Sequence, residues 1–290
     1  MFLVTDDQKY IDFFNNCKLE KEISDNCYIT LSNCFEKDVK FNLTKKEALK
    51  IIESKEIKEK EFIIRTNKDF YSFRNIVKEY INFKFIENGV DIENISTTYI
   101  GPEVNIEKGT KITGDTHIYG KSCIGKNNLI SSSYIENTNI KDDNKILNSH
   151  IVGAMIGCKN EIGPFCRMRG KAVIDNECVL GNFVEIKSSN IKDHVKIKHL
   201  SYIGDTFIEK NVNIGCGFVT ANYDGKRKYP TTIEENVFVG CNTTIVSPVT
   251  LKENCFIAAG SVITKDVEKN DLAIARSRQI NKTNYVKQKK

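Results

Sequence analysis

The sequence predicts a mainly β protein: a left-handed parallel β-helix of hexapeptide repeats, preceded by a small N-terminal α/β region. Two observations predict this fold. Aliphatic residues recur every six positions over most of the chain, and all 17 glycines fall from Gly89 onward. A fixed short repeat is the sequence signature of a solenoid. We therefore divide the 290 residues into an N-terminal region, 1–88, and a β-helix domain, 89–290.

The N-terminal region mixes helix-like and strand-like patterns. Residues 45–54 and 70–83 have the apolar spacing of amphipathic helices, and residues 61–65 (EFIIR) are typical of a strand. The second predicted helix leads directly into the repeats. Three roles stay open for residues 1–65: a packing or oligomerisation element, a binding module, or a remnant of a larger domain.

The repeat period of six fits neither the helical period near 3.6 nor the alternation of a simple strand. It fits a coil with three flat faces, in which one aliphatic side chain per face points inward and stacks on its counterpart in the next coil. An ordinary β-sandwich, the alternative, would need alternating patterns and frequent hairpin turns. The uninterrupted runs are Ile100, Ile106, Ile112, Ile118, Ile124 and Ile130; Ile191, Ile197 and Ile203; and Ile233, Val239, Ile245, Leu251, Ile257 and Ile263.

Glycine often follows the inward aliphatic residue, as at Gly125, Gly163 and Gly204. We expect these glycines at corners, where they supply either a positive φ or a close approach of two backbones.

One segment interrupts the repeats. Residues 218–232 (FVTANYDGKRKYPTT) are polar and basic. Insertions in a solenoid lie outside the coil, often on the binding face. This inserted loop is therefore the first candidate for a functional segment.

Composition narrows the class of partner. The net charge of +5 results from 43 basic and 38 acidic residues, which is too mixed for a nucleic-acid binder and suits small anionic ligands. The ten cysteines form no C-x-x-C pair, so no metal site is predicted and reduced thiols are expected. Without a secretory signal or an apolar run of transmembrane length, the expected location is the cytoplasm, away from membranes.

Histidine is the side chain best suited to act as a general base near neutral pH. Of the four histidines, His199 is the strongest candidate because Lys187, Lys196 and Lys198 surround it in the sequence and would suit an anionic substrate. The alternative is a surface histidine in a lysine-rich coil.

Several motifs then follow one another in a fixed order. They are 163–169 (GPFCRMR), 181–187 (GNFVEIK), 198–205 (KHLSYIGD), 213–217 (NIGCG), 222–225 (NYDG), 238–240 (FVG), 258–260 (AAG) and 273–276 (AIAR). This series resembles the acetyltransferase half of the bacterial bifunctional enzymes that acetylate glucosamine 1-phosphate and then uridylylate the product. The resemblance is tight over about residues 162–280 and looser between residues 89 and 161.

The resemblance implies acetyl transfer from acetyl-CoA to the amino group of glucosamine 1-phosphate, without a metal, in a homotrimer. His199 matches the general base of that family. Five residues match positions that bind the sugar phosphate: Arg169, Lys187, Tyr202, Asn213 and Lys228. Six match acetyl-CoA contacts: Cys216, Asn222, Tyr223, Cys241, Ala259 and Arg276. The basic C-terminal tail offers a further contact for the phosphates of the coenzyme, or else a solvated end.

The chain departs from the family pattern at several points. Gly170 stands where proline usually follows the second arginine, Cys216 where alanine is common, and Cys241 where a serine usually contacts the coenzyme. A thiol is the weaker hydrogen-bonding group. For Cys241 we favour a buried structural cysteine over a catalytic thiol.

The glycine-free residues 1–88 cannot provide the glycine-rich phosphate loop of the uridyltransferase domain, so that activity is expected to be absent. Two other functions stay open beside acetylation of glucosamine 1-phosphate. One is acetylation of another amino or nucleotide sugar. The other is a non-catalytic β-helix that binds a sugar nucleotide or a separate uridyltransferase.

Overall fold

The structure, a computed structural model, describes residues 2–4, 28–30, 61–63, 75, 78–79 and 81–286. Three short strands near the N-terminus form a parallel sheet in the order β2–β1–β3, with bounds Phe2–Val4 (β1), Tyr28–Thr30 (β2) and Glu61–Ile63 (β3). The strand predicted at 61–65 is thus confirmed over its first three residues. The helix predicted at 45–54 lies outside the described residues.

The helix predicted at 70–83 continues four residues further, to residue 87. It ends in a Schellman motif, in which the backbone N–H of Val90 donates to the Phe85 carbonyl and that of Gly89 to the Ile86 carbonyl, both at 3.0 Å. Gly89 adopts φ +88°, which glycine tolerates at a helix C-terminus. None of the helical residues that the structure describes belongs to a segment long and apolar enough to cross a membrane.

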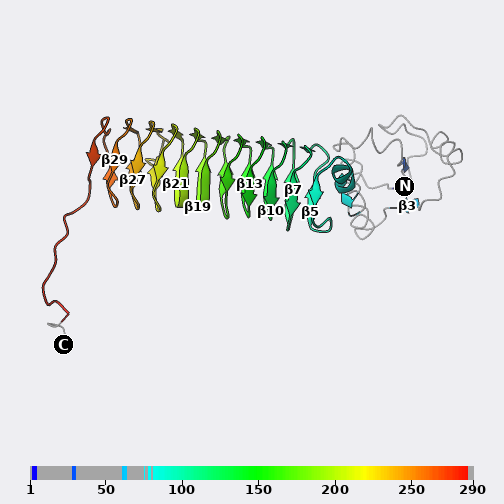
Figure 1. Ribbon diagram of the computed structural model, residues 1–290, viewed down its shortest axis with the longest axis horizontal. Helices are drawn as coiled ribbons and strands as arrows, with labels where there is room; N and C mark the ends of the chain where they lie inside the picture. Colours follow the sequence, from blue (N-terminus) through cyan, green and yellow to red (C-terminus); the bar gives the residue numbers. More distant parts are fainter. Residues whose placement is uncertain are drawn as a thin grey trace.

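From Asp91 onward the chain forms the predicted left-handed parallel β-helix, whose coils are stacked in chain order along the long axis in Figure 1. Hydrogen bonds link residues 16 to 18 positions apart on neighbouring coils. The first face comprises β4 (Asp91–Ile92), β7 (Lys111–Thr113), β10 (Leu129–Ser131), β13 (Lys145–Leu147), β16 (Glu161–Ile162), β19 (Val179–Lys187), β21 (Lys196–Gly204), β23 (Asn213–Ile214), β26 (Phe238–Val239), β29 (Phe256–Ile257) and β31 (Leu272–Ala273).

The second face includes the C-terminal halves of β19 and β21. Its other strands are β5 (Thr98–Ile100), β8 (Thr116–Tyr119), β11 (Tyr134–Glu136), β14 (His150–Val152), β17 (Arg167–Arg169), β24 (Val219–Ala221), β27 (Thr244–Val246) and β30 (Val262–Ile263). The third face comprises β6 (Asn105–Ile106), β9 (Cys123–Ile124), β12 (Asn139–Ile140), β15 (Met155–Ile156), β18 (Val173–Ile174), β20 (Asn190–Ile191), β22 (Thr206–Ile208), β25 (Thr231–Ile233) and β28 (Val249–Leu251).

The six-residue pattern identified the core correctly. Every aliphatic position of the three uninterrupted runs is buried, and Ile112 and Ile197 have no exposed surface. The predicted bounds of the inserted loop, 218–232, are too wide. Phe218 is fully buried in the core, and Val219–Ala221 and Thr231–Ile233 pair with the next coil. The inserted loop is therefore limited to residues 222–230.

The corner glycines follow the expectation of either a positive φ or a close approach. Gly163 has φ +94°, whereas Gly125 and Gly204 have no positive φ, so the close approach is the reason that applies to them. A Cβ on Gly125 would lie 3.0 Å from the backbone of Lys141 in the next coil, which leaves the close approach as the reason for glycine there. Many left-handed corner positions are instead taken by asparagine, such as Asn148 at φ 42°, because asparagine tolerates this region better than most residues.

Beneath one corner, buried asparagines bond coil to coil. The Asn144 side-chain amide donates to the carbonyl of Gly157 at 2.8 Å, and its oxygen accepts from the backbone N–H of Asn160 at 2.9 Å.

We expect Asn144→Ala to lower the free energy of unfolding by about 1–3 kcal/mol, because it leaves buried backbone groups unpaired. Urea denaturation measures this. The control is Asn139→Ala, an exposed position on β12, where a change within about 0.5 kcal/mol is expected. An equal loss of unfolding free energy in both variants would contradict a stabilising role for the buried asparagines.

Candidate functional site

The candidate site lies where two long strands cross a corner of the β-helix. β19 (Val179–Lys187) and β21 (Lys196–Gly204) each have nine residues and run from the first face onto the second. They pair in register, so that Asn182 lies opposite His199 and Glu185 opposite Tyr202. Most residues predicted to bind ligands lie on these two strands or on the coils beside them.

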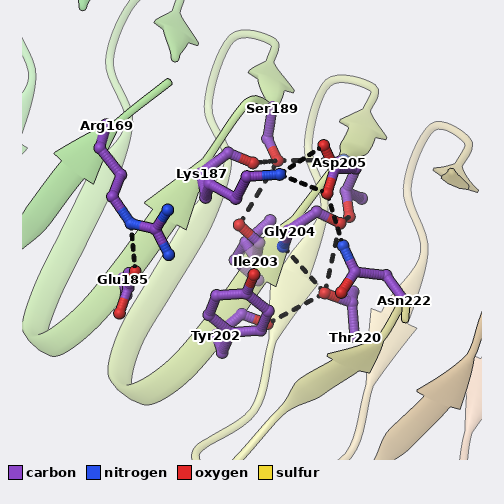
Figure 2. A network of polar contacts seen from close by, with 11 residues as sticks. Arg169, Glu185, Lys187, Ser189, Tyr202, Ile203, Gly204, Asp205, Thr220 and Asn222 are labelled. Carbon is purple, nitrogen blue, oxygen red and sulfur yellow. Dashed lines mark hydrogen bonds and ion pairs between the residues drawn. The ribbon is translucent and has the colours of Figure 1, made fainter. Parts of the chain in front are cut away.

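Lys187 and Asp205 form a close ion pair at the end of these strands. The Lys187 Nζ donates to both carboxylate oxygens of Asp205, at 2.8 and 2.7 Å (Figure 2). Only 12% of the Lys187 side chain is exposed. Burial disfavours the charged ammonium, but the bonds to Asp205 outweigh this effect, and the pKa of Lys187 is raised. Lys187 therefore stays charged in a mostly buried position.

Asp205 also receives a bond from the inserted loop. The Asn222 side-chain amide, which is buried, donates to Oδ2 of Asp205 at 2.7 Å. Gly204 makes this convergence possible. A Cβ at position 204 would lie 2.6 Å from the Tyr202 hydroxyl and 2.8 Å from the Asn222 amide nitrogen. Any side chain there would displace one of the two residues, so glycine is required by the close approach.

Arg169 lies beside Lys187 on the preceding coil. The two residues are paired in register on β17 and β19. The Arg169 Nε donates to Oε1 of Glu185 at 2.7 Å, as Figure 2 shows, and 41% of the Arg169 side chain is exposed. Two cations thus project from neighbouring coils, each held by its own carboxylate.

The inserted loop is a small hairpin. Tyr223 and Lys228 form an antiparallel bridge, and the backbone N–H of Tyr229 donates to the Asn222 carbonyl at 2.9 Å. At the tip, the Asp224 carboxylate accepts bonds from the backbone N–H groups of Arg227 and Lys226 and from the Tyr229 hydroxyl. These bonds lower the pKa of Asp224. The hairpin is thus held in a defined shape by its own polar groups.

The hairpin brings Lys228 to the other two cations. The Lys187 ammonium is near enough to lower the pKa of Lys228, with a smaller contribution of the same sign from Arg169. The cluster therefore holds three cations and the two carboxylates of Glu185 and Asp205, an excess of one positive charge. Guanidinium and ammonium groups in such an arrangement suit a phosphate.

A row of outward-facing positions lies along the same corner. The core residues Ile197, Ile214, Val239 and Ile257 are paired in register on four successive coils. The positions two residues later are therefore stacked in the same order. They are His199, Cys216, Cys241 and Ala259.

The backbones along this row are closely stacked. A Cβ on Gly215 would lie 2.6 Å from the backbone nitrogen of Cys241, and the Gly260 N–H donates to the Cys241 carbonyl at 2.7 Å. In the described part of the chain, the backbone N–H groups of Cys241 and Ala259 have no hydrogen-bond acceptor. They are available to a ligand at the corner.

His199 is exposed, and its imidazole makes no hydrogen bond to any of the residues described. Asn213, in contrast, is not part of the Lys187 network. It lies on the outer side of the first face, between Lys196 and Phe238 of the adjacent coils. Arg276 extends over the last corner, where its Cδ would lie 3.8 Å from a Cβ on Gly260. It thus reaches the Ala259 end of the row.

Cys241 corrects one expectation. Its side chain is exposed, so the interpretation as a buried structural cysteine is wrong. Corner positions two residues after the core residue point outward, which the hexapeptide pattern could have indicated. The buried cysteines are others: burial raises the pKa of Cys166 and Cys178 to about 12 and that of Cys255 to about 11. Gly170 adopts φ +68°, which proline cannot, so the backbone there differs from one that carries proline.

Two residues of the site were not predicted from the sequence: Asp205 and Glu185. Both belong to motifs already noted, but neither was assigned a role. Each carboxylate lies one coil from the cation that it pairs with, since Arg169 precedes Glu185 by 16 positions and Lys187 precedes Asp205 by 18. The coil length was the signal that could have identified them.

Comparisons with known proteins agree with this picture. The family described as "Bacterial transferase hexapeptide (six repeats)" matches residues 230–265. The chain is 42% identical over 212 residues to the "Bifunctional protein GlmU" of Staphylococcus haemolyticus, covering 73% of this chain and 47% of that protein. It is 45% identical over 212 residues to that of a Geobacillus species and 44% over 215 residues to that of Clostridium beijerinckii. These matches confirm the resemblance predicted from the motifs.

The chain spans about half the length of the curated relatives it matches. Among solved structures, a UDP-N-acetylglucosamine acyltransferase from Bacteroides fragilis 9343 aligns with a TM-score of 0.45 and 17% identity, over 60% of this chain and 70% of that chain.

Proposed function

We propose that this protein is an acyltransferase of the hexapeptide type that transfers the acetyl group of acetyl-CoA to the amino group of glucosamine 1-phosphate. One observation carries the proposal: the cluster of three cations is centred on Lys187 of β19, and His199 lies on β21, the strand that pairs with β19 in register. A phosphate-binding cluster beside a general base is what a sugar phosphate with a reactive amine requires. The similarity to the bifunctional GlmU proteins supports the same reaction.

In the proposed mechanism His199 acts as the general base. A ring nitrogen of the exposed imidazole accepts a proton from the sugar amine as the amine nitrogen attacks the thioester carbonyl carbon. The unpaired backbone N–H groups of Cys241 and Ala259 stabilise the negative charge that develops on the carbonyl oxygen. Collapse of the tetrahedral intermediate breaks the carbon–sulfur bond, and the departing thiolate takes up the proton held by His199.

Binding is divided between two groups of residues. Arg169, Lys187 and Lys228 hold the sugar phosphate, with Tyr202 beside them and Asn213 on the adjoining face. Coenzyme contacts come from the other residues matched to the family, which are Cys216, Asn222, Tyr223, Cys241, Ala259 and Arg276. We place the reaction in the cytoplasm and in a homotrimer, which would shield outer faces of the solenoid.

The reaction is tested by thiol release from acetyl-CoA with glucosamine 1-phosphate as acceptor, and with glucosamine 6-phosphate and UDP-glucosamine as controls. We expect release with glucosamine 1-phosphate alone. The cation cluster favours a bare phosphate over the diphosphate of UDP-glucosamine, and a phosphate on C6 lies farther from the C2 amine than one on C1. The thiol reagent must first be corrected for the exposed Cys123 and Cys241. Release with UDP-glucosamine instead would contradict the acceptor, and release with none of the three would contradict the proposed reaction.

The role of His199 is tested by His199→Ala. Loss of a general base lowers kcat by roughly 10²–10⁴-fold, and the fold should be retained because the side chain is exposed. The matched control is His194→Ala, a nearby half-exposed histidine paired with Glu177, which should keep its turnover. If both variants turn over at the same rate as the unaltered protein, another residue is the base.

Phosphate binding is tested by Lys187→Met. We expect KM for glucosamine 1-phosphate to rise about tenfold or more, because a hydrogen bond to a charged group contributes about 1.5–3 kcal/mol and the Asp205 carboxylate is left unneutralised. Lys210→Met, which removes a surface lysine paired with Glu235, is the control and should leave KM unaltered. An unchanged KM in the Lys187 variant would remove this residue from the phosphate site.

A further inference from the structure

Asp205 occupies a position between the two groups of binding residues. Its carboxylate accepts two bonds from Lys187 and one from Asn222, and both residues donate to the same oxygen, Oδ2, at 2.7 Å (Figure 2). Its backbone is also tied to this point, since the Asp205 N–H donates to the Lys187 carbonyl at 2.9 Å. One side chain therefore holds a residue of each group.

These contacts fix side chains that would otherwise be free to turn. Exposed ion pairs contribute little because both side chains stay mobile and solvated. Here 12% of the Lys187 side chain and 25% of the Asp205 side chain are exposed, and Asn222 is buried. Lys187 is held by both oxygens, so the direction of its ammonium is set. An ammonium has three donors, and the bonds to the two Asp205 oxygens do not use all of them.

Asn222 connects Asp205 to the inserted loop. Its carbonyl accepts the bond from Tyr229 that closes the hairpin, and the hairpin bears Tyr223 and Lys228. A shift of the Asn222 side chain would therefore move the base of the segment that delivers the third cation. Asp205 is connected to the phosphate cluster along two routes, directly through Lys187 and indirectly through this hairpin.

The geometry points to Asp205 as a positioning residue that couples binding of the sugar phosphate to binding of the coenzyme. This inference rests on the proposed function. The carboxylate itself would repel a phosphate, so it acts through Lys187 and Asn222. One ligand bound against Asn222 further restrains the Asp205 carboxylate and, through it, Lys187, so that the second ligand loses less conformational freedom when it binds. Such coupling is reciprocal: each ligand increases the affinity for the other by the same factor.

Asp205→Asn weakens this link with little change in volume. The amide has one oxygen, one NH₂ group and no charge. If the oxygen takes the Oδ2 position, it still accepts from Lys187 and Asn222, but the NH₂ group faces the Lys187 Nζ, which lies 2.8 Å from Oδ1 in the native protein. If the amide is turned the other way, its NH₂ group faces the donors of both Lys187 and Asn222. In either case the negative charge and the two-oxygen hold on Lys187 are lost.

The test is a calorimetric titration of the full chain with glucosamine 1-phosphate, with and without saturating coenzyme A. We expect coenzyme A to tighten sugar-phosphate binding about fivefold or more in the unaltered protein, the lower end of typical coupling. In Asp205→Asn the ratio of the two Kd values should fall toward one, because the variant loses the charge and the second acceptor that hold Lys187. The reverse titration, coenzyme A with and without the sugar phosphate, should give the same ratios.

Glu185→Gln is the matched control. It removes the other carboxylate of the cluster, which holds Arg169 and has no bond to Asn222. This variant should weaken sugar-phosphate binding and keep the native ratio. Asn222→Ala breaks the same link from the other side and should lower the ratio even if Asp205→Asn fails to fold.

The outcomes separate the two hypotheses. A native ratio retained in Asp205→Asn or in Asn222→Ala overturns the role of Asp205 and leaves the proposed function intact, as does a ratio of one in the unaltered protein. A ratio that also collapses in Glu185→Gln overturns it too, because the coupling would then belong to the charge of the cluster as a whole. Failure of the unaltered protein to bind glucosamine 1-phosphate overturns the proposed function, and the coupling with it.

Discussion

The in-register stacking of aliphatic side chains inside the coil is the constraint on which the rest of the structure depends. Because residues such as Ile197, Ile214 and Val239 lie directly over one another, every outward residue is also placed over its counterpart one coil later. Side chains far apart in the chain are brought together without any dedicated packing of their own. A single slip of register would separate Lys187 from Asp205 and His199 from Cys216 together, so the core specifies the site as well as the fold.

The stacking of the coils also determines which charged side chains lie next to one another. A parallel ladder places outward side chains of neighbouring coils about 5 Å apart, so two adjacent cations repel each other unless carboxylates lie between or beside them. Arg169 and Lys187 are such neighbours, and each has a carboxylate one coil further on. Lys228 comes from the hairpin instead, where the Lys187 ammonium lowers its pKa more than the Asp205 carboxylate raises it. The cluster is thus stable without a ligand and still retains one positive charge that an anion can neutralise.

Much of this arrangement could be predicted from the sequence, because the period of six directly reports which side chains point inward. Ile112 and Ile245 are buried as the pattern requires, and Phe218 was missed only because it precedes a loop whose polar composition masked its place in the repeat. The site was less predictable. The family motifs identified Lys187 and Asn222 as binding residues, but the bonds that join them pass through Asp205 and depend on the number of residues in one particular coil. Periodicity alone does not give that number where coils vary from 16 to 25 residues.

The corner position of the row explains which of its side chains can vary. Among the described residues, the unpaired groups along this row include the backbone N–H groups of Cys241 and Ala259, and their positions are set by glycines that permit close stacking rather than by the side chains of the row. Cysteine can therefore stand where other residues serve in related proteins, because the backbone donors do not depend on it. His199 is different, since only its imidazole can exchange a proton near neutral pH. Side-chain identity matters at one end of the row, and backbone geometry matters along the remainder.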